Sequence, residues 1–433
     1  MGEWRPIHEF CLEQQPPCAL RMGGEAVTLQ VHLPNVHERR ENTRHARGLQ
    51  PWSELAAACD RAARELRLAA GAGVRDVRGT LKRRWAEVAG GDGFGGALAT
   101  LAGQADGAAA ALDTVSELAP DFPKLQQRAI DLAQLARQFG APCSADRVRW
   151  VDLTPLHVRL VESALDIREA LDAQRAAAPK AWVFTSATLG DDERLSWFTV
   201  PSGLGDADTL KLGSPFDYAA HARLWVPPRL PRPGDAAHAQ AVAHIAARCA
   251  GVLGGRTFVL TTTLRALALV ANTLAERLGA TGEHLEVLVQ GSEPKRALLQ
   301  RFLARPASVL VGSQSFWEGI DVPGDALQCV IIDKLPFPPP NDPLVEARVR
   351  QIERAGGSAF NAYFVAEAAV SLKQGAGRLI RSEIDRGLLV VCDPRLTQMG
   401  YGARLRAALP PMPLLRDETE AMDWLAHIAV ARS

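Results

Sequence analysis

Short apolar runs separated by helical patterns dominate the second half of this 433-residue chain. Strand-length runs that are apolar at nearly every position are buried on both faces, as in parallel sheets with helices above and below. The runs are Leu224–Val226, Thr257–Leu260, Glu286–Val289, Ser308–Val311, Cys329–Ile332 and Gly387–Val391. Helical spacing fills the intervals 237–253, 264–278, 294–304 and 361–376. Residues 222–433 are therefore predicted to form an α/β domain with right-handed crossovers.

The region before residue 179 has a different pattern. Residues 46–178 are rich in Ala, Leu, Arg and Glu, and apolar residues three and four apart predict a helix from Trp52 to Leu68. Further helices are expected near 97–117, 122–139 and 155–176, without strand alternation. This part is predicted to be a mainly helical domain, and its residues leave open whether it carries a site of its own. Residues 1–45 lack a periodic apolar face and are predicted to be irregular or loosely packed.

Residues 179–221 connect the two parts. The apolar run Ala181–Phe184 is predicted to be a strand, and Thr185–Leu189 (TSATL) follows it directly. This order places hydroxyl groups at the carboxyl end of the strand, where open α/β sheets bind ligands. A short helix near 191–199 and a turn-rich link at Gly213–Tyr218 complete the segment.

Composition limits the possible classes of function. Lys and Arg total 49, as do Asp and Glu, so the net charge is zero and nucleic-acid binding must rest on local sites. No apolar run approaches the ~20 residues of a membrane helix, and no signal peptide begins the chain. Seven scattered cysteines predict reduced thiols and a cytoplasmic protein. A metal could in principle bind Cys11, Cys18, His32 and His37, but their spacing matches no usual zinc pattern, and no metal site is predicted.

The segment Gln374–Arg381 (QGAGRLIR) is the most informative motif. Arg378 and Arg381 are spaced to share one face of a helix just before the last strand. Guanidinium groups bind phosphate bidentately and can stabilise the charge that develops on a transferred γ-phosphate. Such a pair alone is more often a solvated helix face, whereas the whole octet is more specific.

Two further segments follow buried strands. In Val311–Gly324, Gly312 and Ser313 present backbone N–H groups that suit phosphate oxygens, and Glu318 and Asp321 could bridge nucleotide and nucleic-acid sites. The alternative is a glycine-rich turn with a packed tryptophan.

The hydroxyls of Thr261–Thr263 precede a predicted helix. They suit helix capping and, equally, a phosphate at the positive end of the helix. As an isolated signal, this segment favours capping.

Together these motifs resemble those of superfamily 2 helicases. Thr185–Leu189 resembles the motif that couples nucleotide state to strand movement, and Gly312–Asp321 and Gln374–Arg381 resemble the two C-terminal motifs. Gly213–Phe216 and Lys334–Pro343 (KLPFPPPNDP) narrow the resemblance to the iron–sulfur branch that contains the DinG, YoaA and XPD-like DNA helicases. The likeness covers about residues 46–415.

The resemblance implies a RecA-like helicase C-terminal lobe at 222–433, an arch-like domain at 46–178 and a remnant of the first lobe at 179–221. It implies 5′→3′ unwinding of DNA driven by ATP with Mg²⁺, and single-stranded DNA as the partner. By motif, the resemblance implies that Gln374, Arg378 and Arg381 contact the ATP phosphates and act in catalysis, and that Glu318, Gly319 and Asp321 line the ATP interface. It implies that Ser186, Ala187 and Thr188 belong to the coupling motif. It implies that DNA is bound by Thr262, Thr263, Gly312 and Ser313.

The sequence also departs from the family pattern. It contains no Gly-Lys dipeptide, and hence no GxxxxGK[ST] phosphate loop, and no DEAH-type box precedes the helical region. The family's iron–sulfur cluster needs four cysteine ligands, but the N-terminal region offers only Cys11 and Cys18. The chain is therefore predicted to be the C-terminal part of a helicase, inactive alone, whose N-terminal half is missing. Two alternatives are a non-catalytic module that binds single-stranded DNA or a partner protein, and an unrelated nucleotide-binding α/β protein.

Overall fold

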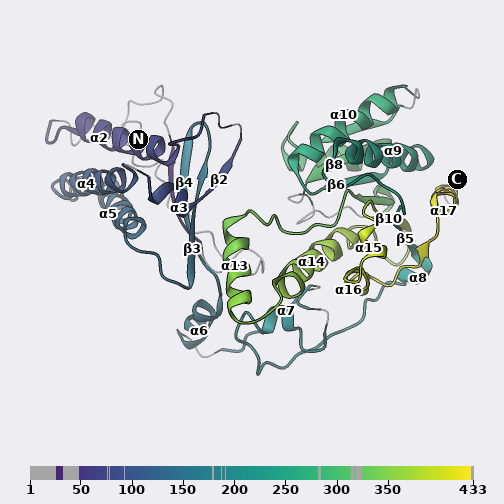
Figure 1. Ribbon diagram of the computed structural model, residues 1–433. Helices are drawn as coiled ribbons and strands as arrows, with labels where there is room; N and C mark the ends of the chain where they lie inside the picture. Colours follow the sequence, from purple (N-terminus) through teal and green to yellow (C-terminus); the bar gives the residue numbers. More distant parts are fainter. Residues whose placement is uncertain are drawn as a thin grey trace. The chain divides into compact units, whose positions relative to one another are not determined.

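The computed structural model describes residues 26–32 and 48–430, except 76, 78, 92, 178–179, 187, 191, 281–283, 314–315 and 317–323. These residues form two compact units (Figure 1). Unit 1 draws on the ranges 1–182, 198–205 and 339–351, and unit 2 on 183–197, 206–338 and 352–433. Among the described helices, none is both long and apolar enough to span a bilayer.

A parallel sheet forms the centre of unit 2. The strands that the structure describes there are β5 (Ala222–Trp225), β6 (Thr257–Thr261), β7 (Glu286–Val289), β8 (Ser308–Ser313), β9 (Cys329–Ile332), β10 (Gly387–Val391) and β11 (Leu414–Leu415). They are ordered β11-β5-β10-β9-β6-β8-β7, and every neighbouring pair is parallel. All the strands predicted for residues 222–433 are present, so the α/β fold expected there is confirmed.

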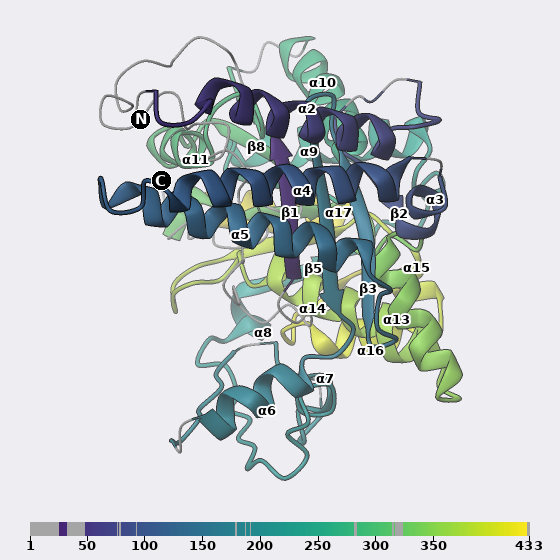
Figure 2. The same cartoon turned by 90° about the vertical axis from the view of Figure 1, so that its left-hand side faces the viewer.

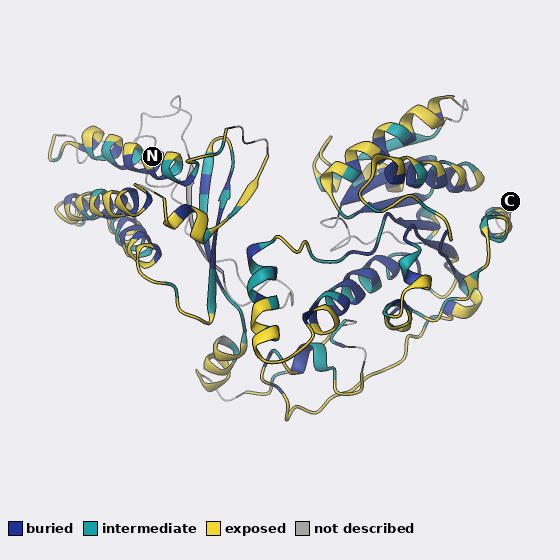
Figure 3. Ribbon diagram, viewed as in Figure 1, coloured by how far each residue is buried: buried dark blue, intermediate teal, exposed yellow. Residues whose placement is uncertain are grey.

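Helices cover both faces of this sheet. They are α8 (Tyr218–His221), α9 (Ala236–Leu253), α10 (Leu264–Ala280), α11 (Lys295–Ala304), η2 (Gly324–Ala326), η3 (Phe360–Phe364), α14 (Val365–Ala376), α15 (Arg395–Gln398), α16 (Gly402–Ala408) and α17 (Glu418–Val430). Phe258 and Leu260 of β6 belong to a core shared with α11, α14 and α16, whereas Val259 belongs to a second core shared with α9, α10 and α17. Burial on both faces explains the uninterrupted apolar strands, which are dark blue in Figure 3.

Unit 1 combines an antiparallel sheet with helices. Its described strands, in the order β1-β4-β3-β2, are β1 (Ala26–His32), β2 (Leu81–Arg84), β3 (Arg147–Leu153) and β4 (His157–Ala164). Its helices are α2 (Trp52–Ala70), α3 (Trp85–Ala89), α4 (Phe94–Asp113), α5 (Asp121–Gly140) and α6 (Arg168–Ala177). In Figure 2, α2, α4 and α5 run alongside one another. Their buried alanines and leucines share one core with the inward residues of β3 and β4.

Several expectations for the N-terminal part were wrong in detail. The helix expected near 155–176 is β4 followed by α6, and β3 was not expected at all. Within the region expected to be irregular, residues 26–32 form β1, which pairs with β4 over its whole length. The rest of 1–45 lies outside the described residues.

Two further segments differ from expectation. Residues 181–184, expected to be a strand, have no regular secondary structure, and the helix expected near 191–199 is reduced to α7 (Ser196–Thr199). The sequence analysis also did not identify α13 (Pro343–Arg354). Residues 339–351, which include most of α13, belong to unit 1 although their sequence neighbours belong to unit 2.

Candidate functional site

The carboxyl edge of the unit 2 sheet gathers one set of predicted site residues. Thr261, the last residue of β6, pairs with Ser313, the last residue of β8. Thr262 and Thr263 follow β6 at this edge, and Asp333 follows β9, the other neighbour of β6. The predicted DNA-binding residues therefore lie on adjacent strand ends.

Asp333 organises this edge, and sequence reasoning missed it. Its carboxylate accepts hydrogen bonds from the backbone N–H of Thr262 (3.0 Å), the Thr262 hydroxyl (3.3 Å) and the backbone N–H of Lys334 (2.8 Å). Asp333 is 2% exposed. Burial raises its pKa to about 7, although the positive charge of Lys334 and the hydrogen bonds oppose the rise. An acidic residue directly after a buried apolar strand was the available signal.

Thr263 is the N-cap of α10. Its hydroxyl oxygen accepts a hydrogen bond from the backbone N–H of Ala266 (3.1 Å), which the sequence analysis favoured as the simpler role. Thr263 is exposed. Since the bond uses only the oxygen as acceptor, the hydroxyl hydrogen can still be donated to a phosphate.

Gly312 and Ser313 have packing roles in the structure. The backbone N–H and the hydroxyl of Ser313 both donate to the side-chain oxygen of Gln290, at 2.6 and 2.9 Å. A Cβ atom at Gly312 would lie 2.9 Å from the Cβ of Phe316, so only glycine fits without a shift. Their proposed contact with DNA phosphate stays a prediction.

The arginine motif lies at the opposite edge of the same sheet. Gln374 is in the last turn of α14, but the helix ends at Ala376, so Arg378 and Arg381 do not lie on one helix face as expected. They occupy the connection that leads into the amino end of β10. The helix ends early because Gly377 begins a turn, in which the backbone N–H of Arg378 bonds to the carbonyl of Gly375.

This connection is held firmly. The carboxylate of Asp385, which is 3% exposed, accepts hydrogen bonds from the backbone N–H groups of Arg381 (2.8 Å) and Ser382 (2.9 Å) and from the Ser382 hydroxyl (2.7 Å). Leu379 lies where a side chain on Gly387 would be, so the connection packs directly on β10. Asp385 is a second residue that sequence reasoning missed.

Positive charge accumulates beside the motif. Burial raises the pKa of Tyr218, while the Ser214 hydrogen bond and the nearby charge of Arg381 lower it. Burial and the charge of Lys211 lower the pKa of Lys373, which immediately precedes Gln374. This environment suits an anion at the amino edge of the sheet.

The remaining predicted residues are described only in part. The hydroxyl oxygens of Ser186 and Thr188 lie 3.1 Å apart, and the Thr188 backbone N–H donates to the Ser186 hydroxyl at 3.1 Å. Ala187 of the coupling motif lies outside the described residues, as do Glu318, Gly319 and Asp321 of the expected ATP interface.

The hydrogen-bond donors at the two edges of the unit 2 sheet suit a phosphate ligand better than a metal ion. Hydroxyl, backbone N–H and guanidinium groups all donate to phosphate oxygens, whereas the described residues contain no group of three or more acidic, His or Cys side chains able to hold a metal. Cys249, Cys329 and Cys392 are buried in the core between the sheet and α9, which does not fit an iron–sulfur cluster. Cys11 and Cys18 lie outside the described residues.

Comparisons with known proteins match part of the chain to helicases. Residues 247–412 match the family model of the helicase C-terminal domain. The ATP-dependent DNA helicase YoaA of Escherichia coli is 41% identical over 277 residues, which are 64% of this chain and 43% of YoaA. The ATP-dependent helicase DinG of Mycobacterium tuberculosis is 36% identical over 303 residues, 67% of this chain and 44% of DinG. The chain thus spans less than half the length of these relatives.

Solved structures of XPD proteins are more distant in sequence. Xpd4 of S. tokodaii aligns over 71% of this chain and 58% of its own, with 13% identity and a TM-score of 0.46. An apo XPD structure aligns over 70% and 62%, with 15% identity and a TM-score of 0.48. The sequence relatives and the domain match agree: residues 247–412 match a helicase C-terminal domain, and about two thirds of the chain is similar to the DinG and YoaA helicases.

Proposed function

We propose that unit 2 is the second motor lobe of an ATP-dependent DNA helicase, with single-stranded DNA at one sheet edge and ATP phosphates at the other. One observation carries the proposal: the Thr263 hydroxyl, which can donate to a phosphate, and two guanidinium groups lie at opposite ends of the strands of one sheet. Thr262 and Thr263 follow β6 at its carboxyl end, and Arg378 and Arg381 precede β10 at its amino end. A rigid sheet between two such sites can transmit the nucleotide state to the DNA.

On the ATP side, the proposed residues are Gln374, Arg378 and Arg381. Bound between two lobes, ATP with Mg²⁺ supplies the phosphoryl group that is transferred to water. The two guanidinium groups stabilise negative charge on the phosphates, and Asp385 fixes the backbone that carries Arg381. The ATP-interface roles of Glu318, Gly319 and Asp321 remain part of the proposal.

We also propose that a first motor lobe must be supplied by polypeptide outside this sequence. The apolar run 181–184 supports this, because its pattern favours a strand but the segment has no regular secondary structure. Val183 is 84% exposed, an unusual position for a valine in such a run. A sheet of the first lobe would cover this segment and would position Ser186 and Thr188 next to the nucleotide.

Alone, the chain is proposed to bind single-stranded DNA without hydrolysing ATP. The phosphate loop and the Mg²⁺ carboxylate that phosphoryl transfer requires are not found in the sequence. In this state the protein acts as a binding module, the alternative that the sequence also left open.

The test is fluorescence anisotropy with a labelled single-stranded oligonucleotide over a range of salt concentrations. We expect weak binding that falls steeply as salt rises, because it rests on phosphate contacts. Thr262→Val should weaken binding while Thr262→Ser retains it, since the serine hydroxyl can replace the threonine hydroxyl that donates to Asp333 and fixes this turn. Arg378→Ala, at the other edge, should leave DNA affinity unchanged. Binding that ignores salt, or that depends on Arg378 and not on Thr262, would contradict the proposal.

A further inference from the structure

One face of the four-stranded sheet in unit 1 carries a row of charged side chains, in which the carboxylate of Asp152 stands between Lys82 and Arg159. Side chains alternate between the two faces of a strand, and Val151 and Leu153 of β3 face the helical core. Lys82 and Arg84 of β2 pair with Asp152 and Trp150 of β3, which therefore lie on the opposite face. Arg159 of β4 pairs with Asp152 and extends the row.

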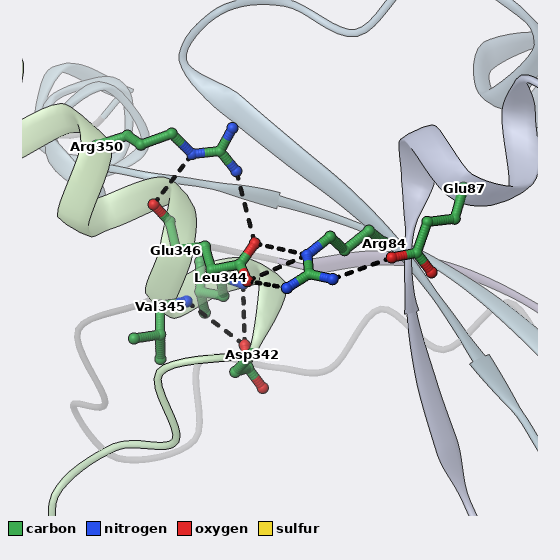
Figure 4. Close-up of polar contacts among 7 residues, drawn as sticks. All are labelled: Arg84, Glu87, Asp342, Leu344, Val345, Glu346 and Arg350. Carbon is green, nitrogen blue, oxygen red and sulfur yellow. Dashed lines mark hydrogen bonds and ion pairs between the residues drawn. The ribbon is translucent and has the colours of Figure 1, made fainter.

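Two carboxylates of the segment 342–346 form ion pairs with Lys82 and Arg84. Figure 4 shows Arg84 of β2 pointing at Glu346 of α13, with Glu87 on its other side. The Arg84 Nε lies 2.8 Å from Glu346 Oε2, and its Nη2 contacts Glu346 Oε1, so the pair is bidentate. Lys82 Nζ lies 2.7 Å from Asp342 Oδ2.

This arrangement has the chemistry of a phosphate site filled by carboxylates. A guanidinium fork binds the two oxygens of a carboxylate and two oxygens of a phosphate in the same way. Lys82 also lies over the ring of Trp150, 5.0 Å from its centroid, which fixes the direction of its ammonium group. The hydrogen bonds from Arg84 hold the pKa of Glu346 below its usual value, so Glu346 is an anion at neutral pH.

We propose that Lys82 and Arg84 form a second contact surface for the backbone of single-stranded DNA, and that Asp342 and Glu346 occupy it as phosphate mimics until DNA displaces them. The inference rests on the proposed function only in the choice of ligand, because this surface belongs to unit 1 and the proposed DNA edge belongs to unit 2.

The carboxylates in these two ion pairs can be replaced by phosphates. The side chains of Arg84 and Glu346 are 48% and 21% exposed, and those of Lys82 and Asp342 are 37% and 19% exposed. Ion pairs open to solvent contribute little net stability and weaken as salt rises. A DNA strand that offers phosphates at high local concentration can therefore compete with them.

The experiment uses the full chain and a fluorescein-labelled oligothymidylate, with affinity measured by anisotropy against salt. The test variant combines Asp342→Asn with Glu346→Gln. Asn can still cap α13, where Asp342 accepts a hydrogen bond from the backbone N–H of Leu344 at 2.9 Å. We expect affinity to rise about threefold or more, and the salt slope to steepen by about 0.7 for each additional phosphate that the protein neutralises.

Matched variants separate this effect from a general change of charge. Glu353→Gln removes an exposed carboxylate from the same helix, and it should give a much smaller increase in affinity. Adding Arg84→Gln to the double variant should abolish the increase. Thermal melting of each variant confirms that it is folded.

The outcomes also separate this inference from the proposed function. The inference is overturned if the double variant binds no tighter than the original chain, if Glu353→Gln binds as tightly as the double variant, or if the increase survives Arg84→Gln. Loss of affinity in Thr262→Val without any increase in the double variant rejects this inference alone. An increase in the double variant without any dependence on Thr262 rejects the DNA edge of unit 2 alone.

Discussion

The carboxylate of Asp333 binds both the backbone N–H and the hydroxyl of Thr262, at 3.0 and 3.3 Å. This pair joins the ends of β6 and β9, two neighbouring strands. The buried carboxylate therefore fixes the conformation of the threonine turn that we assign to DNA. If this turn binds DNA as we propose, its conformation depends on the protonation state of a single side chain.

The stability of unit 2 should depend on pH through Asp333. Its folded pKa, about 7, is above the value of 3.8 for an unperturbed carboxyl, so the folded state favours the protonated form. The stabilisation from this group is fully present below pH 3.8 and is lost as pH rises through 7. We therefore compare the free energy of unfolding of Asp333→Asn with that of the original chain at each pH. The advantage of the variant should be about 2 to 3 kcal/mol larger at pH 8 than at pH 5.

Urea unfolding of both proteins at the two pH values measures this difference. Asp385→Asn is a useful comparison, because Asp385 is also a buried carboxylate that accepts backbone hydrogen bonds. An equal pH response in the original chain and in Asp333→Asn would show that Asp333 ionises normally.

Thr263→Ala should lower the free energy of unfolding by about 1 kcal/mol, because α10 loses the hydrogen bond from its N-cap to the backbone N–H of Ala266. Thr263→Ser keeps the hydroxyl and should restore most of that loss. Chemical denaturation of the three proteins tests the expectation. Equal stability of the Ala and Ser variants would mean that the cap is unimportant.

Glu162→Gln should destabilise unit 1 strongly. Arg149 and Glu162 form an ion pair at 2.6 Å with both side chains 3% exposed, so the substitution leaves the guanidinium charge buried without a counter-charge. The expected loss is about 3 kcal/mol or more. Asp60→Asn removes one partner of the exposed pair with Arg64 and should cost less than about 1 kcal/mol. Thermal or urea unfolding compares the two, and similar losses would contradict the expectation.

The purified chain should show no DNA-stimulated ATP hydrolysis. Arg378 and Arg381 can stabilise charge on the phosphates, but the sequence offers no phosphate loop to position them. Steady-state phosphate release with and without single-stranded DNA checks this. A rate that DNA raises, and that Arg378→Ala returns to the basal value, would reject the proposal that a first lobe is required.

The sequence predicted the sheet of unit 2 well because both faces of each strand are apolar. Strand β6, for example, places Phe258 and Val259 in two different cores, so no polar residue interrupts the run. The same information placed Thr262 at a strand end. It did not show that α14 ends at Ala376, because the turn that begins at Gly377 and the packing of the connection on β10 together end that helix.

The sheet of unit 1 was missed for the opposite reason. Arg149 and Glu162 face the helical core from β3 and β4, so charged residues stand at positions where an alternating pattern requires apolar ones. The buried pair satisfies its charges internally and hides the strands from a hydrophobicity pattern. The ion pairs between the segment 342–346 and β2 could not be predicted either, because they join residues distant in the sequence.

The distance between those partners matters while the chain is being made. Asp342 follows Lys82 by 260 positions, and Glu346 follows Arg84 by 262. At a synthesis rate of about 5 to 20 residues per second, roughly 13 to 52 seconds pass before the ribosome delivers Asp342 and Glu346. During that interval β2 has emerged without the carboxylates that later cover it. A nascent chain therefore presents Lys82 and Arg84 before Asp342 and Glu346 exist, with Glu87 as the neighbouring partner of Arg84.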